Sequence, residues 1–316
     1  MKKIFPLFFF VLFIHVIIFF WQTKIDFKPV QQDNYLEYAT ALKNMNFTQS
    51  FIAPNDTRLF PGLGFFLLPF VIFRVQPEYI ALLFMSSTVL LTITVVQHMR
   101  PTTHWFIFFV TLFPPIVARQ YSKISTEALL ISVLFLTYLS IKHNKHFIAT
   151  LLFIFSCLIR PIAFMFYLSY IWTYRSARKY IPFFSLAPLT LGFMNIFLLH
   201  TQLNHQFISN AIIGRIKLPI IWMFFDMIRA WQWGQYRILL SGCIYIFTTL
   251  WILIKLFRKN MYLSQQLSLL KRGILMMSAF IFIIGPEPFL EESPRLLSVL
   301  YPFIFLFFIE RKDYLT

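Results

Sequence analysis

The chain has 316 residues, of which 59% are apolar and 13% are charged, and its mean hydropathy is +0.70. The charged share is about half of that found in soluble domains, and several apolar runs approach the roughly 20 residues that cross a bilayer. This composition excludes an ordinary soluble domain and predicts an all-α, polytopic membrane protein.

The formal net charge is +16, from 28 Lys and Arg against 12 Asp and Glu. Most of the basic residues stand between apolar runs, where they are expected to face the cytoplasm and its anionic lipid. We therefore attribute the charge to membrane topology and expect no nucleic-acid partner. The two cysteines, Cys157 and Cys243, lie in apolar runs and predict neither a disulfide framework nor a metal site.

The first predicted span runs from Ile4 to Trp21, after two lysines. No small-residue cleavage site follows it, so we interpret it as a retained span with its N-terminus inside. Residues 22–58 then form a first outer loop. A short amphipathic helix at the membrane surface is predicted within this loop, because one helical face collects the apolar residues Tyr35, Leu36, Ala39, Leu42 and Met45.

Asp33 stands near the N-terminus of this predicted helix. Its carboxylate is a candidate catalytic group at the mouth of a membrane-embedded cavity. It is equally a candidate N-cap, which would accept hydrogen bonds from the free backbone N–H groups of the first turn. The spacing alone favours neither role.

Four apolar stretches follow before residue 142. The second span is predicted from Leu59 to Phe73 with Arg74 inside, and the third from Glu78 to Val96. The stretches Trp105 to Ala118 and Ala128 to Ile141 hold about 14 residues each, which is short for a full crossing. The topology between 78 and 142 closes only if one segment is re-entrant, and the sequence does not indicate which one.

Basic clusters at 142–146 and 175–179 flank the apolar stretch from Phe147 to Tyr174. Both clusters are predicted to be cytoplasmic, so the stretch should enter the membrane and return, with its turn at Arg160-Pro161. Arg160 is then either a snorkelling residue at a helix break or part of a functional site.

In the rest of the chain, membrane spans are predicted to alternate between the outer side and the cytoplasm. Residues 200–237 form a second outer loop, in which Trp231 and Trp233 are typical of an interfacial aromatic belt. The whole chain, residues 1–316, is predicted to be one integral-membrane domain with about nine to eleven membrane segments. The later spans are expected at 181–199, 238–256, 273–284 and 296–309.

On this topology a set of charged side chains gathers on the outer side, namely Asp33, Glu37, Asp56, Arg58, Glu127, Arg160, Glu287, Glu291, Glu292 and Arg295. Charges in or against hydrocarbon are costly and tend to be paired or functional. Arginine binds a lipid-linked phosphate bidentately, and a carboxylate takes the proton of an acceptor hydroxyl. The set indicates glycosyl transfer from a polyprenyl phosphate. No phosphate-binding glycine loop and no metal-ligand spacing is present, so neither a nucleotide cofactor nor zinc is expected.

Five features in order resemble the GT-C superfamily of integral-membrane glycosyltransferases, in particular its bacterial and PIG-V-like mannosyltransferase relatives. They are Asp33-Asn34-Tyr35-Leu36, Arg58-Leu59-Phe60-Pro61-Gly62, Tyr121-Ser122 with Thr126-Glu127-Ala128-Leu129-Leu130, Arg160-Pro161, and Pro294-Arg295 before Tyr301-Pro302. The resemblance covers most of the chain in layout. It departs from the pattern at Asn34, where many members carry a second acidic residue.

The resemblance implies that Asp33 is the catalytic base that deprotonates the acceptor hydroxyl, with inversion at the sugar carbon. It also implies that arginines bind the donor phosphate and that glutamates orient the sugar hydroxyls. These binding residues would be Arg58, Glu127, Arg160, Glu291 and Arg295. No cofactor is implied beyond a weakly used divalent cation, and no metal site is expected.

The implied donor is a polyprenyl-phosphate-linked hexose, with mannose as one candidate sugar. The implied acceptor is a hydroxyl on a lipid, a glycan or a protein. Membrane lipid would surround the protein, which is expected in a bacterial inner membrane with its active site on the outer face.

Simpler roles and two other functions stay open. Glu127 also suits the N-terminus of a helix, where the dipole favours negative charge, and Glu291 also suits a solvated turn. A Wzy/EpsG-like polysaccharide polymerase or ligase would carry its essential acid in the 200–237 loop instead of the first loop. A transporter of lipid-linked glycans would show symmetric halves and paired charges at mid-membrane depth.

Overall fold

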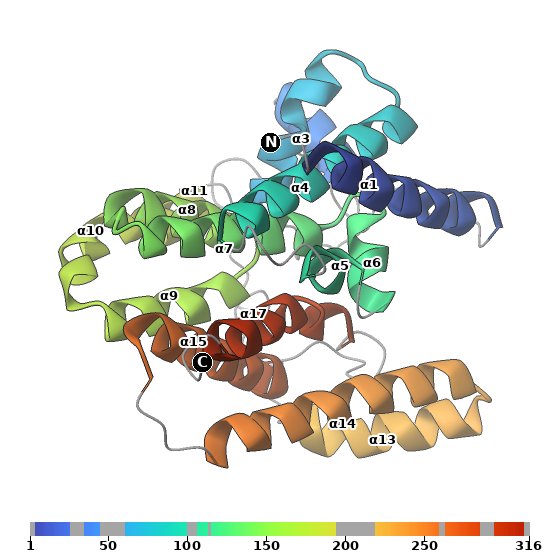
Figure 1. The fold of residues 1–316 in the computed structure, drawn as a ribbon. Coiled ribbons are helices and arrows are strands. Elements are labelled where there is room, and N and C mark those ends of the chain that lie inside the picture. Colours follow the sequence, from blue (N-terminus) through green and yellow to red (C-terminus); the bar gives the residue numbers. More distant parts are fainter. Residues whose placement is uncertain are drawn as a thin grey trace. The chain divides into compact units, whose positions relative to one another are not determined.

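The computed structural model describes residues 4–25, 35–44, 61–99, 106–112, 115–193, 219–258, 263–284 and 294–312. In these residues the chain is helical and contains no strand, which confirms the predicted all-α class (Figure 1). The chain divides into two compact units. The first holds residues 1–163 and 179–202, and the second holds residues 164–178 and 203–316.

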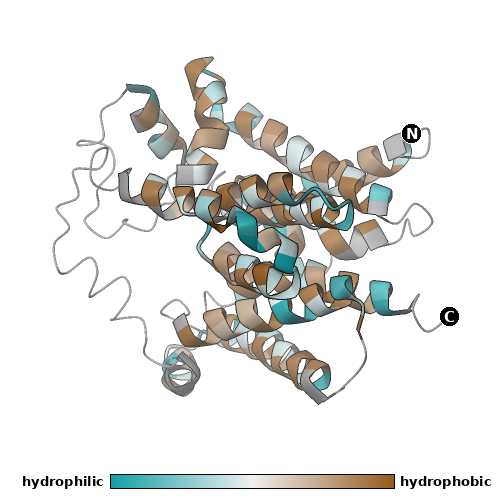
Figure 2. Cartoon of the chain, turned by 90° about the vertical axis from the view of Figure 1, so that its left-hand side faces the viewer, coloured by the Kyte–Doolittle hydropathy of each residue, from teal (hydrophilic) through white to brown (hydrophobic). Residues whose placement is uncertain are grey.

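Among the described residues, four helices are long and apolar enough to cross a membrane: Pro6–Lys24, Pro77–His98, Tyr236–Leu256 and Gln265–Ile283. Figure 2 shows hydrophobic residues over most of the helical turns. The helix Tyr236–Leu256 leaves a row of large apolar side chains exposed, including Leu240, Ile244 and Phe247. Water does not favour such rows but lipid does, so the findings indicate a membrane protein. The total of about nine to eleven segments stays a prediction.

The helices of the first unit are α1 (Ile4–Phe20) with its continuation η1 (Trp21–Ile25), α2 (Tyr35–Asn44), α3 (Pro61–Ile72), α4 (Pro77–Met99), α5 (Phe106–Thr111), α6 (Pro115–Tyr121), α7 (Thr126–Lys142), α8 (His146–Ile159), α10 (Ile181–Phe184) and α11 (Leu186–Phe193). Helix α1 confirms a helix where the first span is predicted. Helix α7 is buried along almost its whole length and forms the core of this unit.

Helices α4 and α7 run in the same direction. The hydroxyl oxygens of Thr92 on α4 and Ser132 on α7 lie 2.9 Å apart, and further along both helices the rings of His98 and His143 lie 5.4 Å apart. The chain must therefore return between the end of α4 and the start of α7. It does so through α5 and α6, of six and seven residues, neither of which is long enough to cross a bilayer. This broken connection lies within residues 78–142, where one re-entrant segment is predicted, and the re-entrant path itself stays a prediction.

Helix α4 also separates two ends of the first unit. Its 23 residues extend over about 34 Å, with the Arg74 turn before its first residue and His98 beside the basic turn 142–146. Arg74 and the basic turn therefore lie at opposite ends of a helix that is long enough to cross the bilayer. The prediction that both face the cytoplasm is therefore incompatible with a full crossing by α4, and the single arginine is the weaker of the two topological signals.

Helices α7 and α8 form an antiparallel hairpin. Asn144 makes the turn with a positive φ of 57°, a conformation that asparagine adopts more readily than most residues. The Lys145 backbone N–H donates to the Ser140 carbonyl oxygen at 2.8 Å and closes the turn. At the other end of the hairpin, Arg160 is extended (φ −156°) and ends α8.

After Arg160 the chain returns to the end from which α8 began. Phe147, in the first turn of α8, packs on Tyr180 and Phe183, with ring centroids 5.9 and 5.8 Å apart. The stretch 147–174 thus starts and finishes at the same end, which confirms the reversal predicted at Arg160-Pro161. It also brings Lys179, the last residue of the second basic cluster, near His146 of the first.

A helix, α2, lies where the sequence predicts an amphipathic helix in the first loop, while its place on the outer membrane face stays a prediction. Its apolar face, with Tyr35, Tyr38, Ala39 and Leu42, is buried, and it packs on α3. Gly64 of α3 makes room for the Tyr38 ring, because a side chain at this position would overlap it. Burial, with a smaller contribution from Tyr35, raises the pKa of the Tyr38 phenol, which stays neutral.

The second unit contains most of α9 (Ile162–Thr173), followed by η2 (Arg175–Tyr180), which it shares with the first unit, then α13 (Pro219–Gln232), α14 (Tyr236–Arg258), α15 (Gln265–Ile284) and α17 (Leu300–Lys312). Helices α13 and α14 lie side by side, joined by a turn at Gly234 with a φ of 66° (Figure 1). Within the range predicted as the second outer loop, residues 219–232 therefore form a helix.

The interior of the second unit is aromatic. The rings of Phe166 on α9 and Phe303 on α17 have centroids 5.3 Å apart, and Gly273 of α15 leaves room for Phe166. The Tyr301 hydroxyl of α17 lies 3.2 Å from the Thr249 hydroxyl and donates to the Tyr245 carbonyl oxygen at 3.3 Å. These contacts join α9, α14, α15 and α17.

Candidate functional site

Glu127 is the only acidic residue between Glu78 and Asp226 in the sequence. It lies in the first turn of α7, which Ser125 caps by accepting a hydrogen bond from the Ala128 backbone N–H at 3.2 Å. Its side chain is fully buried. The helix dipole favours a negative charge at this position, so the simpler role predicted for Glu127 also holds.

The structure brings Glu127 together with Arg160, the residue that ends α8. The Arg160 Nη2 atom lies 2.7 Å from the Glu127 Oε1 atom in an ion pair. Arg160 Nε donates to the Thr126 hydroxyl at 2.8 Å, and that hydroxyl donates to Glu127 Oε2 at 3.0 Å. The three side chains form a closed polar cluster, which we call the Glu127–Arg160 cluster.

The electrostatics of the cluster favour both charges. Glu127 lies at the N-terminal end of α7, where the helix dipole is positive, and Arg160 lies at the C-terminal end of α8, where it is negative. The two side chains differ in accessibility, because the Arg160 side chain is 18% exposed and that of Glu127 is 0% exposed. Arg160 is therefore the partner with an exposed part, while the carboxylate that holds it is enclosed.

The cluster lies far from the basic turn. Helix α8 has 14 residues from His146 to Ile159 and is about 21 Å long. Arg160 follows its last residue, whereas the basic turn precedes its first. The distance is about two thirds of the roughly 30 Å hydrocarbon core of a bilayer.

Tight packing fixes the start of α3 beside this cluster. A Cβ atom on Gly62 would lie 2.7 Å from the Ile159 backbone nitrogen and 2.8 Å from the Leu158 carbonyl carbon. Only glycine allows the two helices to approach so closely. The motif Arg58-Leu59-Phe60-Pro61-Gly62 thus ends against the last turn of α8, directly before Arg160.

A second polar group surrounds the connection between α6 and α7. The hydroxyl of Tyr121 lies 2.9 Å from that of Thr92, and the Ser122 hydroxyl lies 2.8 Å from His15 Nδ1 of α1. Ser122 also donates to the Ala118 carbonyl oxygen at 2.8 Å, so His15 Nδ1 is the donor toward Ser122. Two buried atoms, His15 Nε2 and Gln120 Oε1, have no hydrogen-bond partner among the described residues.

His15 was not among the site residues predicted from the sequence. It could have been identified as a histidine in the middle of an otherwise apolar span, because ionisable residues at that depth are rare and face the protein interior. It is fully buried and stacks beside Tyr121, with ring centroids 5.8 Å apart. The buried polar groups of α1, α6 and α7 lie along the same short segment that leads to Thr126.

Of the other predicted site residues, the structure describes only Arg295. Asp33, Arg58 and Glu291 lie outside the described residues. Arg295 belongs to the second unit, is half-buried, and accepts a hydrogen bond from the Ser298 hydroxyl at its carbonyl oxygen, at 2.5 Å. In the described part of the chain, no three His, Cys, Asp or Glu side chains form a group that could hold a metal ion.

Comparison with known proteins found no relative of this chain. No family model, no curated protein and no solved structure matches the chain.

Proposed function

We propose that the protein is a membrane glycosyltransferase of the GT-C type, which moves a sugar from a polyprenyl-phosphate donor to an acceptor hydroxyl. The observation that supports the proposal most directly is the Glu127–Arg160 cluster, in which a buried carboxylate pairs with the guanidinium group of a partly exposed arginine side chain. Arginine held in this way binds a phosphate bidentately and neutralises it as a leaving group.

In the proposed reaction the acceptor oxygen attacks the anomeric carbon of the sugar. The bond between that carbon and the phosphate oxygen breaks, and the polyprenyl phosphate leaves with both electrons. Asp33 takes the proton of the acceptor hydroxyl, and the sugar carbon inverts because no covalent enzyme intermediate forms. Arg160 binds the departing phosphate. Arg58 and Arg295 keep the phosphate-binding roles that the resemblance implies.

Glu127 and Thr126 act as positioning residues for Arg160 in this proposal. Both carboxylate oxygens of Glu127 have partners within the cluster, one on Arg160 and one on Thr126. Orientation of sugar hydroxyls, implied by the resemblance, is then left to Glu291 and to Arg160 itself. No cofactor is proposed.

The proposed orientation follows from charge. The end of the first unit that carries the first basic cluster and Lys179 faces the cytoplasm, since Lys and Arg are retained on that side. The N-terminus is inside, α1 leads out, and α4 returns to the cytoplasmic side. The Arg74 turn and the Glu127–Arg160 cluster then belong to the outer half, where lipid-linked sugars are the available donors.

The test is sugar transfer in membranes that contain the full chain, with a panel of polyprenyl-phosphate sugars as donors. Arg160→Lys keeps the charge but loses the bidentate geometry, so transfer should fall about 10- to 100-fold. The exposed Arg119 provides the matched control, and Arg119→Lys should transfer normally. Normal transfer by Arg160→Lys would remove the observation on which the proposal rests.

The same assay separates glycosyl transfer by the first loop from a polymerase. Asp33→Asn retains most of the capping ability and removes the base, so transfer should fall about 10²- to 10⁴-fold. Asp226 is the only acidic residue in the 200–237 range. Loss of activity in Asp226→Asn with normal transfer in Asp33→Asn would favour the polymerase instead.

A further inference from the structure

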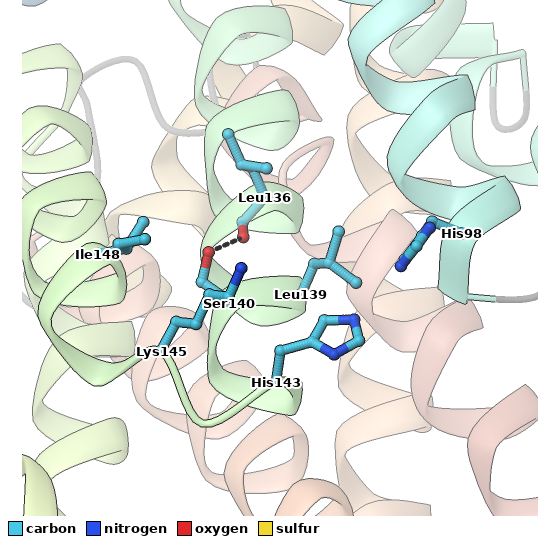
Figure 3. Close-up of a pocket in the computed structure, with 7 residues that line it drawn as sticks. All are labelled: His98, Leu136, Leu139, Ser140, His143, Lys145 and Ile148. Atoms are coloured by element: carbon cyan, nitrogen blue, oxygen red, sulfur yellow. Dashed lines mark hydrogen bonds between the residues drawn. The ribbon is translucent and has the colours of Figure 1, made fainter.

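A cavity of about 310 Å³ lies at the basic end of the first unit, opposite the Glu127–Arg160 cluster. It is lined by His98, Leu136, Leu139, Ser140, His143, Lys145 and Ile148. Figure 3 shows His98 at the end of α4 and His143 at the end of α7 on one side, with Ile148 of α8 on the other. None of these residues belongs to the site described above.

The cavity has a basic polar part and an apolar part. His98, His143 and Lys145 are exposed, and none of the three takes part in an ion pair among the described residues. The cavity lining contains no carboxylate, and the sequence holds no acidic residue from 128 to 225. The apolar lining comes from Leu136, Leu139 and Ile148, so the cavity combines an anion-attracting rim with a hydrocarbon-like wall.

The apolar wall continues along the outside of the protein. Ile148 lines the cavity and is also exposed, and Leu151, one turn further along α8, is exposed as well. An acyl chain bound beside the cavity can therefore lie along α8 toward the membrane interior. A free phosphate would leave this apolar surface unused, whereas a lipid covers it.

The surrounding charge is of the same sign. Lys179 of the second basic cluster is close enough to His146 for their charges to interact. The first basic cluster and Lys179 give this end of the unit a positive charge. Basic pockets between helices on the cytoplasmic side are typical binding sites of anionic lipid headgroups.

We propose that this cavity binds an anionic phospholipid of the cytoplasmic leaflet, with the headgroup phosphate between His98, His143 and Lys145 and an acyl chain on Ile148 and Leu151. The proposal rests on the orientation given above and does not depend on glycosyl transfer. Such a lipid would join the ends of α4, α7 and α8 and anchor this end of the unit at the membrane surface.

Native mass spectrometry of the detergent-purified full chain tests this site. Phosphatidylglycerol is titrated against phosphatidylcholine with the same acyl chains, and wild type should bind phosphatidylglycerol at least about fivefold more tightly. Lys145→Gln should lose about fivefold in affinity for phosphatidylglycerol. Lys179→Gln removes the same charge at the same end without altering the cavity, so it should bind as wild type does.

A variant that leaves the charge unchanged gives an independent test of the cavity. Leu139→Trp fills it and should abolish phosphatidylglycerol binding while the protein still elutes as wild type does on size exclusion. Equal losses in Lys145→Gln and Lys179→Gln would overturn the proposal in favour of diffuse attraction. Equal binding of phosphatidylcholine would overturn headgroup recognition, and competition by inorganic phosphate alone would show a site for a free anion instead of a lipid.

Discussion

At the scale of single residues, the ion pair between Glu127 and Arg160 determines what this part of the chain can do. A buried carboxylate without a partner would cost several kcal/mol, and a guanidinium group in the same place would have no fixed direction. Together they hold one cationic group at a defined position, and only the cationic partner is accessible. This arrangement suits recognition of an anion.

The ion pair between Glu127 and Arg160 predicts how two variants change the free energy of unfolding. Glu127→Ala leaves Arg160 without its counter-ion and should lower the free energy of unfolding by about 3–5 kcal/mol. The double variant Glu127→Leu with Arg160→Met replaces the pair by apolar side chains and should recover most of that loss, without sugar transfer. Thermal unfolding in detergent measures both variants. If the double variant were as unstable as Glu127→Ala, lost packing and not an unpaired charge would be the cause.

Two buried groups near the same segment have no evident structural benefit. His15 Nε2 and Gln120 Oε1 are buried without a hydrogen-bond partner among the described residues, and an unsatisfied polar atom costs about 1–3 kcal/mol. Polar groups retained at such a cost are frequently functional or bound to water.

At the scale of elements, the contact between α3 and α8 determines the surroundings of Arg160. Gly62 brings the start of α3 against the last turn of α8, directly before the residue that carries the guanidinium group. The short helix α2 packs on the other part of α3 through its aromatic face. The three helices therefore form one support on this side of the cluster.

This contact predicts the effect of a single methyl group. Gly62→Ala would bring a Cβ atom within 2.7 Å of the Ile159 backbone nitrogen, and backbone atoms cannot move away cheaply. We expect a loss of about 1–3 kcal/mol in unfolding free energy, together with reduced sugar transfer. Thr40→Ala on the exposed face of α2 is the matched control and should change stability by less than about 0.5 kcal/mol. Wild-type stability in Gly62→Ala would mean that α3 does not lie this close to α8.

At the scale of the whole molecule, the arrangement of α4, α7 and α8 determines which groups share a side of the membrane. The Arg74 turn and the basic turn lie at opposite ends of α4. The α5–α6 connection returns the chain through two helices that are each too short to cross a bilayer, and α4 and α7 run in the same direction. Charge alone could not establish this order, because the segment from 100 to 126 carries few strong topological signals.

Cysteine labelling tests the orientation. In a background with Cys157→Ala and Cys243→Ala, Arg74→Cys should react with a membrane-impermeant maleimide from outside intact cells. Asn144→Cys should react only after the cells are permeabilised. Labelling of both positions from the same side would mean that α4 does not cross the membrane. The reverse pattern would contradict the proposed orientation while leaving the fold intact.

Several features were predictable from the sequence because they depend on local properties. The membrane class follows from the transfer free energies of individual side chains, which add along the chain. The helix at 35–44 follows from apolar spacing, and the reversal at Arg160-Pro161 follows from two flanking basic clusters and the conformation that proline imposes. Glu127 and Arg160 were both identified as candidates, because charges are rare in such a chain.

Only the tertiary structure decided which of these residues meet. Glu127 and Arg160 pair because the hairpin of α7 and α8 brings the N-terminal end of one helix to the C-terminal end of the other. His15 and Ser122 meet across 107 positions of sequence, and Lys179 lies near His146 because the chain reverses between them. Hydropathy determines that a segment enters the membrane, but it does not determine which faces of two buried helices pack together. That choice depends on the shapes of side chains such as Gly62 and on the few polar groups that must find a partner.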